Sequence, residues 1–217
     1  MSTMDTPTLK LNPKRGFVIE KNPFLNPDLE LIYHALAEND EVVIGIGSAQ
    51  LSHEPGLILS AGERIELTDY VLQQQGINPA RYILIPIEDS VNNAQWVGEI
   101  RMVSPRWHTV YTRNFKNASV FKAHQRAFGY DIIQVDEQKP EMDYFALIAQ
   151  ELKGSTLASA QIKVLFPESA LTKMEEMGIL SRINTIYNHA RDEEARKDSI
   201  DRILFLGGMR PPTGVWA

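Results

Sequence analysis

The sequence predicts an α/β fold, in which helices cover both faces of a parallel β-sheet. Short apolar, β-branched runs alternate along the chain with segments whose apolar residues recur at helical spacing. This alternation is typical of strands joined by helical crossovers, which chain chirality makes right-handed. An apolar fraction of 43% in 217 residues is sufficient for a buried core.

Five strands and the helices between them follow from this pattern. The expected strands are residues 16–19, 41–46, 82–85, 109–112 and 130–135, and the expected helices are residues 29–37, 61–75, 94–102 and 118–128. Asp28 is a plausible N-cap for the first helix, and Asn92 is one for the third. Gly76 and Gly129 are expected to end the second and fourth helices.

The chain changes character after Pro140, where helical segments follow one another without strands. Further helices are expected at residues 144–152, 171–177 and 183–206. The last of these is highly charged between Arg191 and Asp198, and its acid–base pairs at i,i+3 and i,i+4 spacing favour a solvated helix. We therefore expect an N-terminal arm at residues 1–15, a main domain at 16–178 and a helical C-terminal extension at 179–217. The extension is expected to mediate a homo-oligomer or a larger assembly, with Trp216 docked on the body or on a neighbouring subunit.

Composition argues against several classes of protein. The 28 acidic and 22 basic residues give a formal charge of −6, which argues against a nucleic-acid clamp. The absence of cysteine excludes disulfides, thiol nucleophiles and zinc–thiolate sites. The five histidines do not pair at metal-ligand spacing, so no metal site is expected. The sequence has neither a run of about 18 apolar residues nor a signal-peptide pattern, which predicts a soluble, cytoplasmic protein without membrane contact.

Two loops of the predicted sheet carry candidate binding residues. In an open parallel sheet, ligands bind outside the carboxyl ends of the strands, at the point where the strand order reverses. The loop after Ile46 is rich in small residues and offers the polar side chains of Ser48 and His53, although such a loop is also compatible with a simple tight turn. After the third strand, Asn93 and Trp96 share one face of a helix start, where they are able to bond a carboxamide and stack on a flat ring. The alternative is that this segment only caps the helix and fills the core.

Several motifs, taken in order, resemble a known family. They are residues 44–53 (IGIGSAQLSH), 61–65 (AGERI), 82–87 (YILIPI), 93–98 (NAQWVG) and 110–112 (VYT). In order and nearly in spacing they resemble the archaeal-type nicotinamide-nucleotide adenylyltransferases from residue 16 to about residue 130. The resemblance implies a Rossmann-like nucleotidyltransferase fold and an enzyme that joins nicotinamide mononucleotide to the adenylyl part of ATP with Mg²⁺, forming NAD and pyrophosphate. It assigns nucleotide binding to Ser48, His53, Asn93 and Trp96, with Asn93 and Trp96 at the nicotinamide end.

The phosphate-binding motifs of that family are degenerate in this chain. The family's first strand runs into Gly-Arg-Phe-Gln-Pro-Phe-His-x-Gly-His, and here the two histidines correspond to Leu25 and Asp28 and the glycine between them to Pro27. Leucine has no donor, proline has no N–H, and aspartate repels phosphate. A second family motif, Ser-Gly-Thr-x-x-Arg, is absent from residues 143–150. Lys21 and Arg64 remain as possible phosphate contacts.

Three functions are compatible with these observations. The first is a nucleotidyltransferase-like protein without catalytic residues, which retains a nicotinamide-nucleotide pocket or an assembly role. The second is an active adenylyltransferase with altered phosphate contacts, for which alone Mg²⁺ is expected as cofactor. The third is a structural protein that uses the scaffold without a ligand. The sequence favours the first, because each missing phosphate donor removes stabilisation of the transition state.

Overall fold

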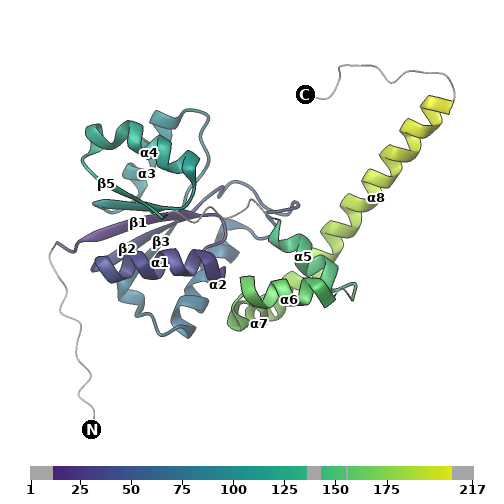
Figure 1. Cartoon of the computed structure of the whole chain (residues 1–217), viewed down its shortest axis with the longest axis horizontal. Helices are drawn as coiled ribbons and strands as arrows, with labels where there is room; N and C mark the ends of the chain where they lie inside the picture. Colours follow the sequence, from purple (N-terminus) through teal and green to yellow (C-terminus); the bar gives the residue numbers. More distant parts are fainter. Residues whose placement is uncertain (1–11, 136–142, 155, 207–217) are drawn as a thin grey trace, which may run out of the picture.

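The computed structural model describes residues 12–135, 143–154 and 156–206, and it contains the predicted parallel sheet (Figure 1). The strands are β1 (Arg15–Glu20), β2 (Glu41–Ile46), β3 (Tyr82–Pro86), β4 (Thr109–Thr112) and β5 (Asp131–Gln134). They lie in the order β3-β2-β1-β4-β5, and every neighbouring pair is parallel. The α/β fold class predicted from the sequence is confirmed.

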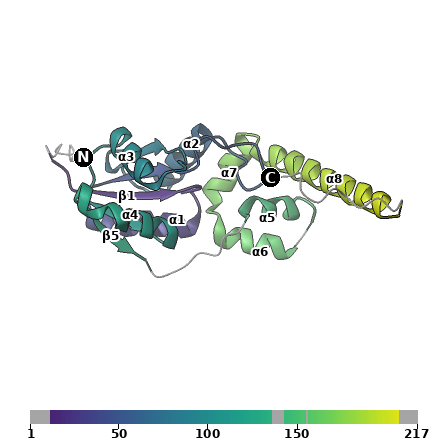
Figure 2. The ribbon, with the colours of Figure 1, turned by 90° about the horizontal axis from the view of Figure 1, so that it is seen from above.

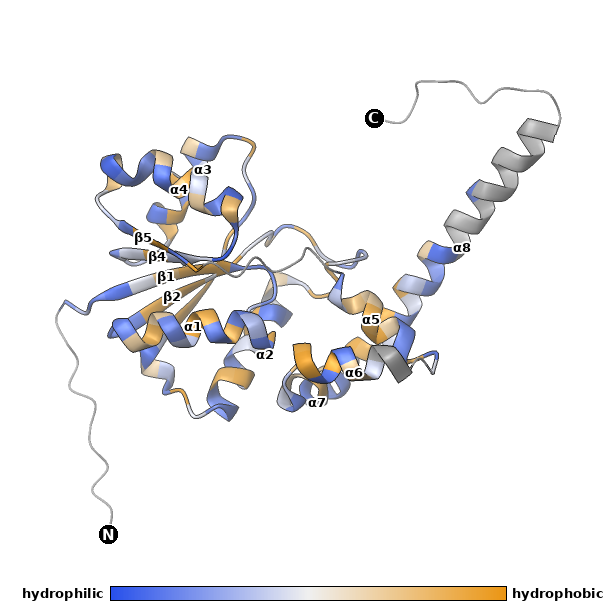
Figure 3. Cartoon of the chain, viewed as in Figure 1, coloured by the Kyte–Doolittle hydropathy of each residue, from blue (hydrophilic) through white to orange (hydrophobic). Residues whose placement is uncertain are grey.

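Two apolar clusters hold helices on opposite faces of this sheet. The helices α1 (Asn26–Glu38) and α2 (Ala61–Gln74) cover one face, and α3 (Asn93–Val103) and α4 (Phe115–Phe128) cover the other (Figure 1). On β1, Val18 belongs to the cluster under α1 and α2, whereas Phe17 and Ile19 belong to the cluster under α3 and α4. Burial on both faces explains the apolar runs in the middle of β1 and along β2, which are largely orange in Figure 3.

The C-terminal helices stand beyond the carboxyl ends of the strands (Figure 1, Figure 2). They are α5 (Tyr144–Glu151), α6 (Thr156–Leu165), α7 (Glu168–Glu176) and α8 (Ile179–Leu206). Phe166, Ile179 and Ile183 are buried in the same cluster as α1 and α2. The expected boundary at residue 178 therefore does not divide two cores: the first turns of α8 belong to the body, and its later turns project away from it (Figure 1). That these later turns mediate assembly stays a prediction.

Three of the expected helix ends are confirmed, among them that of α2, where Gly76 follows the C-cap residue Gln75 with a φ of 78°. The Asn92 side chain accepts hydrogen bonds from the N–H groups of Ala94 at 3.0 Å and Gln95 at 3.3 Å, so it caps α3 as expected. Gly129 ends α4 in the left-handed conformation, with a φ of 66° that favours glycine.

The expected N-cap of the first helix is wrong. Helix α1 begins at Asn26, its N-cap residue is Leu25, and no side chain caps it. Asp28 instead lies inside the first turn. The cause is Pro27, because a proline in the first helical turn loses no hydrogen bond and already has a helical φ.

Residues 1–11, 136–142, 155 and 207–217 lie outside the described residues, so most of the predicted arm and the predicted docking of Trp216 cannot be compared with the structure. Among the helices that are described, none combines the length and apolarity needed to cross a membrane.

An ion pair fastens the root of α8 to the start of α2. Arg182 places its two terminal guanidinium nitrogens 2.8 Å from the two carboxylate oxygens of Glu63. Glu63 also accepts the backbone N–H of Ser60 at 2.9 Å, and the Ser60 side chain accepts the N–H of Glu63, which forms a reciprocal capping box. The hydrogen bond from Arg182 is the main reason why the pKa of Glu63 falls from 4.5 to about 2.

The lowered pKa of Glu63 makes part of the fold's stability depend on pH. Because the pKa is lower in the folded state, this contribution is complete above pH 4.5 and is lost as the pH falls toward 2. We expect Glu63→Gln to flatten the pH dependence of the unfolding free energy in this window by about 1 kcal/mol, allowing for solvent screening. Urea unfolding at several pH values measures it. Glu175→Gln on α7 is the control and should leave the pH dependence of the unfolding free energy between pH 4.5 and 2 unchanged. If Glu63→Gln and the wild type show the same pH dependence in this window, the role of the ion pair is contradicted.

Candidate functional site

The strand order reverses between β1 and β4, and this point is the expected position of a ligand crevice. From β1 the chain continues outward through β2 and β3, whereas β4 and β5 lie on the other side of β1. The segments that follow β1 and β4 therefore diverge at the carboxyl edge of the sheet. In folds of this class, the gap between such segments is where nucleotides bind.

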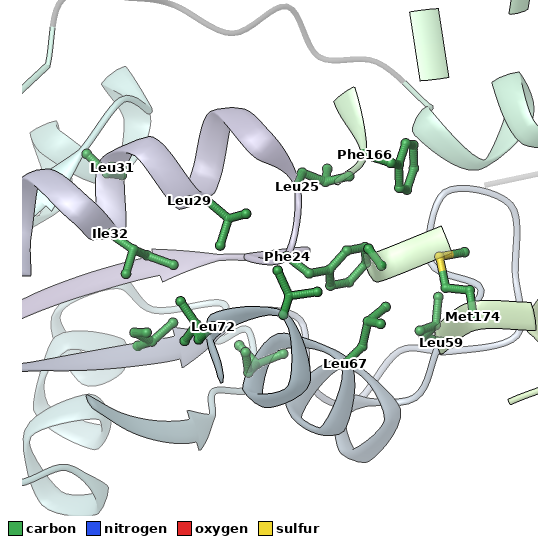
Figure 4. Close-up of a cluster of buried hydrophobic side chains, with 14 of the residues drawn as sticks. Phe24, Leu25, Leu29, Leu31, Ile32, Leu59, Leu67, Leu72, Phe166 and Met174 are labelled. Carbon is green, nitrogen blue, oxygen red and sulfur yellow. The ribbon is translucent and has the colours of Figure 1, made fainter. Parts of the chain in front are cut away.

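The segment after β1 fills this region with apolar side chains. Phe24 is fully buried and Leu25 is 1% exposed, and the rings of Phe24 and Phe166 lie 6.5 Å apart. Figure 4 shows Leu25 beside Phe166, and Phe24 between α1 and the leucines of α2. Asp28, at 2% exposure, is the buried acidic residue of the first turn of α1. The two residues that the motif comparison aligns with the family's histidines are thus a core leucine and a buried aspartate, and the alignment itself stays a prediction.

A cation that the sequence reasoning missed lies at the end of β4. Arg113 directly follows Thr112 and is only 9% exposed. Its guanidinium donates to the backbone carbonyl of Pro27 and, at 3.2 Å, to a carboxylate oxygen of Glu30. Arg113 is the first residue after β4, the strand at which the strand order reverses, and this position in the sequence is the signal that could have identified it. In this structure the guanidinium of Arg113 forms its hydrogen bonds with the start of α1.

Arg64 is buried among backbone carbonyls, an arrangement that does not support the expected contact with phosphate, which stays a prediction. It is 0% exposed, and its guanidinium donates to the carbonyl oxygens of Gly47 at 2.6 Å, Ser48 at 3.0 Å and Lys21 at 3.0 Å. Burial lowers the pKa of Arg64, and the nearby charge of Asp89 opposes this shift. Arg64 therefore joins the loops after β1 and β2 to one another. The Lys21 side chain is exposed and remains a candidate for phosphate.

The loop after β2 contains two residues with an unusual backbone conformation. Ser48 and His53 have positive φ values of 50° and 61°, which residues other than glycine rarely adopt. Ser48 is buried, whereas His53 is exposed, with its Nδ1 2.9 Å from the hydroxyl of Ser52. The backbone of this loop is therefore strained at two residues, and strained backbone conformations are found preferentially at binding sites.

Hydrogen bonds join this loop to the one after β3. The Gln50 side chain accepts the backbone N–H of Asp89 at 3.1 Å and donates to its carboxylate at 3.4 Å. The N–H of Ala49 donates to the carbonyl of Ile87 at 2.9 Å. These hydrogen bonds hold the two loops, and the candidate residues that they carry, next to one another.

Asn93 and Trp96 lie in the first turn of α3, directly after the loop that follows β3. Asn93 is the first residue of the helix and its side chain is exposed. Trp96 is half-buried, its indole N–H donates to the carbonyl of Glu88 at 2.9 Å, and its ring centre lies 5.7 Å from that of Phe121. The polar edge of the indole is thus already used, and stacking is the contact it has left to offer. Binding of a nucleotide by these residues stays a prediction.

The carboxyl edge thus has two halves of different chemistry. The loops after β2 and β3 present the exposed side chains of Asn93 and His53 and the half-buried ring of Trp96, whereas after β1 and β4 Phe24 and Leu25 are buried, Arg113 is paired and Lys21 is exposed. Within residues 12–135, 143–154 and 156–206, no three His, Asp or Glu side chains group as metal ligands would.

The chain is similar to nicotinamide-nucleotide adenylyltransferases of archaea. It is 36% identical to the one of Picrophilus torridus over 178 residues, which cover 79% of this chain and 96% of that protein. It is 32% identical to the one of Methanolobus tindarius, covering 82% and 98%, and 30% identical to the one of Pyrococcus horikoshii, covering 82% and 91%. No protein-family model matches the chain.

Solved structures support the fold. A bifunctional NMN adenylyltransferase/ADP ribose pyrophosphatase from Francisella tularensis superposes with a TM-score of 0.64 at 18% identity, and the match covers 87% of this chain and 57% of that one. A putative nicotinate-nucleotide adenylyltransferase from Vibrio parahaemolyticus superposes with a TM-score of 0.50 at 14% identity, covering 77% and 94%.

The structural role of Arg64 predicts a large effect of a small substitution. Arg64→Lys keeps the charge but loses the planar fork, so carbonyls in the loops after β1 and β2 lose their donors in a buried site. We expect the free energy of unfolding to fall by about 2–4 kcal/mol, as measured by urea denaturation. Arg126→Lys, at an exposed position of α4, should stay within about 0.5 kcal/mol of the wild type. A similarly small effect at Arg64 would show that the lysine ammonium satisfies the same carbonyls.

Proposed function

Because the chain belongs to the nicotinamide-nucleotide adenylyltransferase family, we propose that it binds a nicotinamide nucleotide on the loops after β2 and β3 and has lost efficient adenylyl transfer. The pocket uses the exposed Asn93 for the carboxamide and the half-buried ring of Trp96 for stacking, with His53 on the adjoining loop. The joined pair of loops supports this half of the proposal, because binding groups on a rigid unit lose little entropy when a ligand arrives.

The observation that carries the loss of catalysis is the packing after β1. Leu25 is 1% exposed in the main apolar cluster, and Asp28 puts a carboxyl group into the first turn of α1. A helix N-terminus attracts phosphate through its free N–H groups, and an acidic residue in the same turn competes for them. Each missing donor to the phosphates of the transferred adenylyl group and the leaving pyrophosphate costs about 3–4 kcal/mol in the transition state. Two such losses, although not additive, reduce the rate by several powers of ten.

An active adenylyltransferase is the second candidate, and one observation favours it. The archaeal relatives at 30–36% identity carry that name and match this chain over nearly their whole length. Activity would require cations to reach the triphosphate, and Lys21 has an exposed side chain directly after β1. Among the described residues no three His, Asp or Glu side chains group together, so Mg²⁺ would have to be held by one or two carboxylates together with the phosphates of the substrate.

A turnover assay separates the two candidates. We expect incubation with nicotinamide mononucleotide, ATP and Mg²⁺ to release pyrophosphate at less than about one-thousandth of an ordinary enzymatic rate, which is near 10 per second. Mass spectrometry of the products for NAD excludes simple ATP hydrolysis as the source. Turnover near the ordinary rate would establish the active candidate and refute the proposed loss. If the protein neither turns over nor binds the mononucleotide at millimolar concentration, both candidates fail and a structural role remains.

Trp96 provides the test of the pocket. Trp96→Ala should weaken the binding of nicotinamide mononucleotide by roughly 5- to 150-fold, which corresponds to about 1–3 kcal/mol of lost stacking and buried area, as measured by calorimetry. Trp96→Phe keeps a ring and should recover most of the affinity. Met102→Ala, at an exposed position near the other end of α3, is the matched control and should bind like the wild type. Unchanged affinity in Trp96→Ala would remove this residue from the site.

A further inference from the structure

The loop between β2 and α2 is held at two separate points, and the candidate ligand contact His53 lies between them. At its start, Arg64 donates to the carbonyls of Gly47 and Ser48, with a weaker contact of 3.5 Å to that of Leu51. Further along, the backbone N–H of Gly56 donates at 3.0 Å to the phenol oxygen of Tyr187, which belongs to α8. A residue more than 130 positions away in the sequence thus holds the far end of the loop.

Tyr187 is itself fixed in orientation. Its oxygen lies 2.6 Å and 2.5 Å from the two carboxylate oxygens of Asp143, so the phenol proton is donated to that carboxylate. The same oxygen keeps a lone pair for the N–H of Gly56. The carboxylate of Asp143 is held in this orientation because it caps α5, where it accepts hydrogen bonds from the N–H groups of Phe145 at 3.2 Å and Ala146 at 3.1 Å. One hydroxyl therefore links α8, the start of α5 and the loop after β2.

The turn that Tyr187 holds is the part of the loop next to His53. Glu54 and Leu57 exchange two backbone hydrogen bonds of 3.4 Å and 3.0 Å across this turn. Gly56 completes it with a φ of 80°, in the region that favours glycine. His53 stands just before the turn with its own positive φ of 61°. Such a backbone is maintained only when the surroundings hold it in place. The hydrogen bonds between Glu54 and Leu57 close the turn on itself, and the hydrogen bond from Gly56 to Tyr187 joins the turn to α8.

We propose that Tyr187 is a positioning residue for the nucleotide site: through the N–H of Gly56 it fixes the turn at residues 54–57 and so holds the imidazole of His53 where the ligand binds. This inference rests on the proposed function, because it takes the nicotinamide nucleotide as the ligand of this loop. It gives the root of α8 a part in ligand binding, in addition to its packing on the core.

Tyr187→Phe tests the proposal, because it removes one oxygen and keeps the ring. We expect the dissociation constant for nicotinamide mononucleotide, measured by calorimetry, to rise by about three- to tenfold, as is typical for one lost buried hydrogen bond. Amide hydrogen exchange in the peptide covering residues 52–57 should become faster without any ligand present, which checks the hold on the turn independently of binding.

Tyr82→Phe is the matched control. Tyr82 also donates its phenol proton to a carboxylate, that of Asp69 at 2.6 Å, but it lies at the start of β3 and contacts no part of the loop after β2. Tyr82→Phe should therefore lose some stability while keeping the affinity and the exchange rate of residues 52–57. A purely structural role of Tyr187 predicts the same result for both variants.

A double-mutant cycle with His53→Ala shows whether Tyr187 acts through that imidazole. His53→Ala should weaken binding, and adding Tyr187→Phe to it should have little further effect. If the two effects multiply, or if Tyr187→Phe binds as tightly as the wild type, the positioning role is refuted while the proposed function stands. If the wild type itself does not bind the mononucleotide, the proposed function fails and the ligand role of Tyr187 fails with it.

Discussion

The buried guanidinium of Arg64 is the constraint on which the carboxyl edge of the sheet depends. A cation removed from water is tolerated only where acceptors converge on it, and here the carbonyls of Lys21, Gly47 and Ser48 do so at 2.6–3.0 Å. These carbonyls belong to the loops after two neighbouring strands, so satisfying one side chain sets the path of both loops. The strained φ of Ser48 persists for the same reason, since its carbonyl is one of the acceptors.

The two halves of this edge follow from how their polar groups are satisfied. Beyond β2 and β3, the loops bond to one another through Gln50 and Asp89, which leaves other side chains exposed. Beyond β1 and β4, Arg113 bonds to the start of α1, and Phe24 and Leu25 pack against the C-terminal helices. The carboxyl edge of the sheet therefore has exposed polar side chains beyond β2 and β3 and buried apolar side chains beyond β1. A family resemblance based on motifs in the first half need not carry the chemistry of the second.

The sequence predicted what depends on short-range pattern and missed what depends on long-range partners. All the strands and most helices were foreseen because their apolar spacing is local; α6 was not, because its apolar residues continue directly into the run ending at Phe166 and show no clear period. Arg64 was expected to meet phosphate because a sequence shows a charge but not the carbonyls that surround it. Arg113 and Tyr187 were missed for the same reason. Tyr187 lies in a helix whose charge pattern favours solvation, and only the folded chain brings it to Gly56 and Asp143.

The leucine at position 25 belongs to the core of the fold, at the position that the motif comparison aligns with a histidine of the family. Burying a leucine there yields about 2 kcal/mol of hydrophobic stabilisation, and Phe166 from the C-terminal helices lies beside it (Figure 4). Pro27 acts in the same direction by fixing the first turn of α1 before folding. Leu25 and Pro27 thus stabilise the packing at this end of the sheet, and a histidine introduced at position 25 would have to be desolvated inside an existing core.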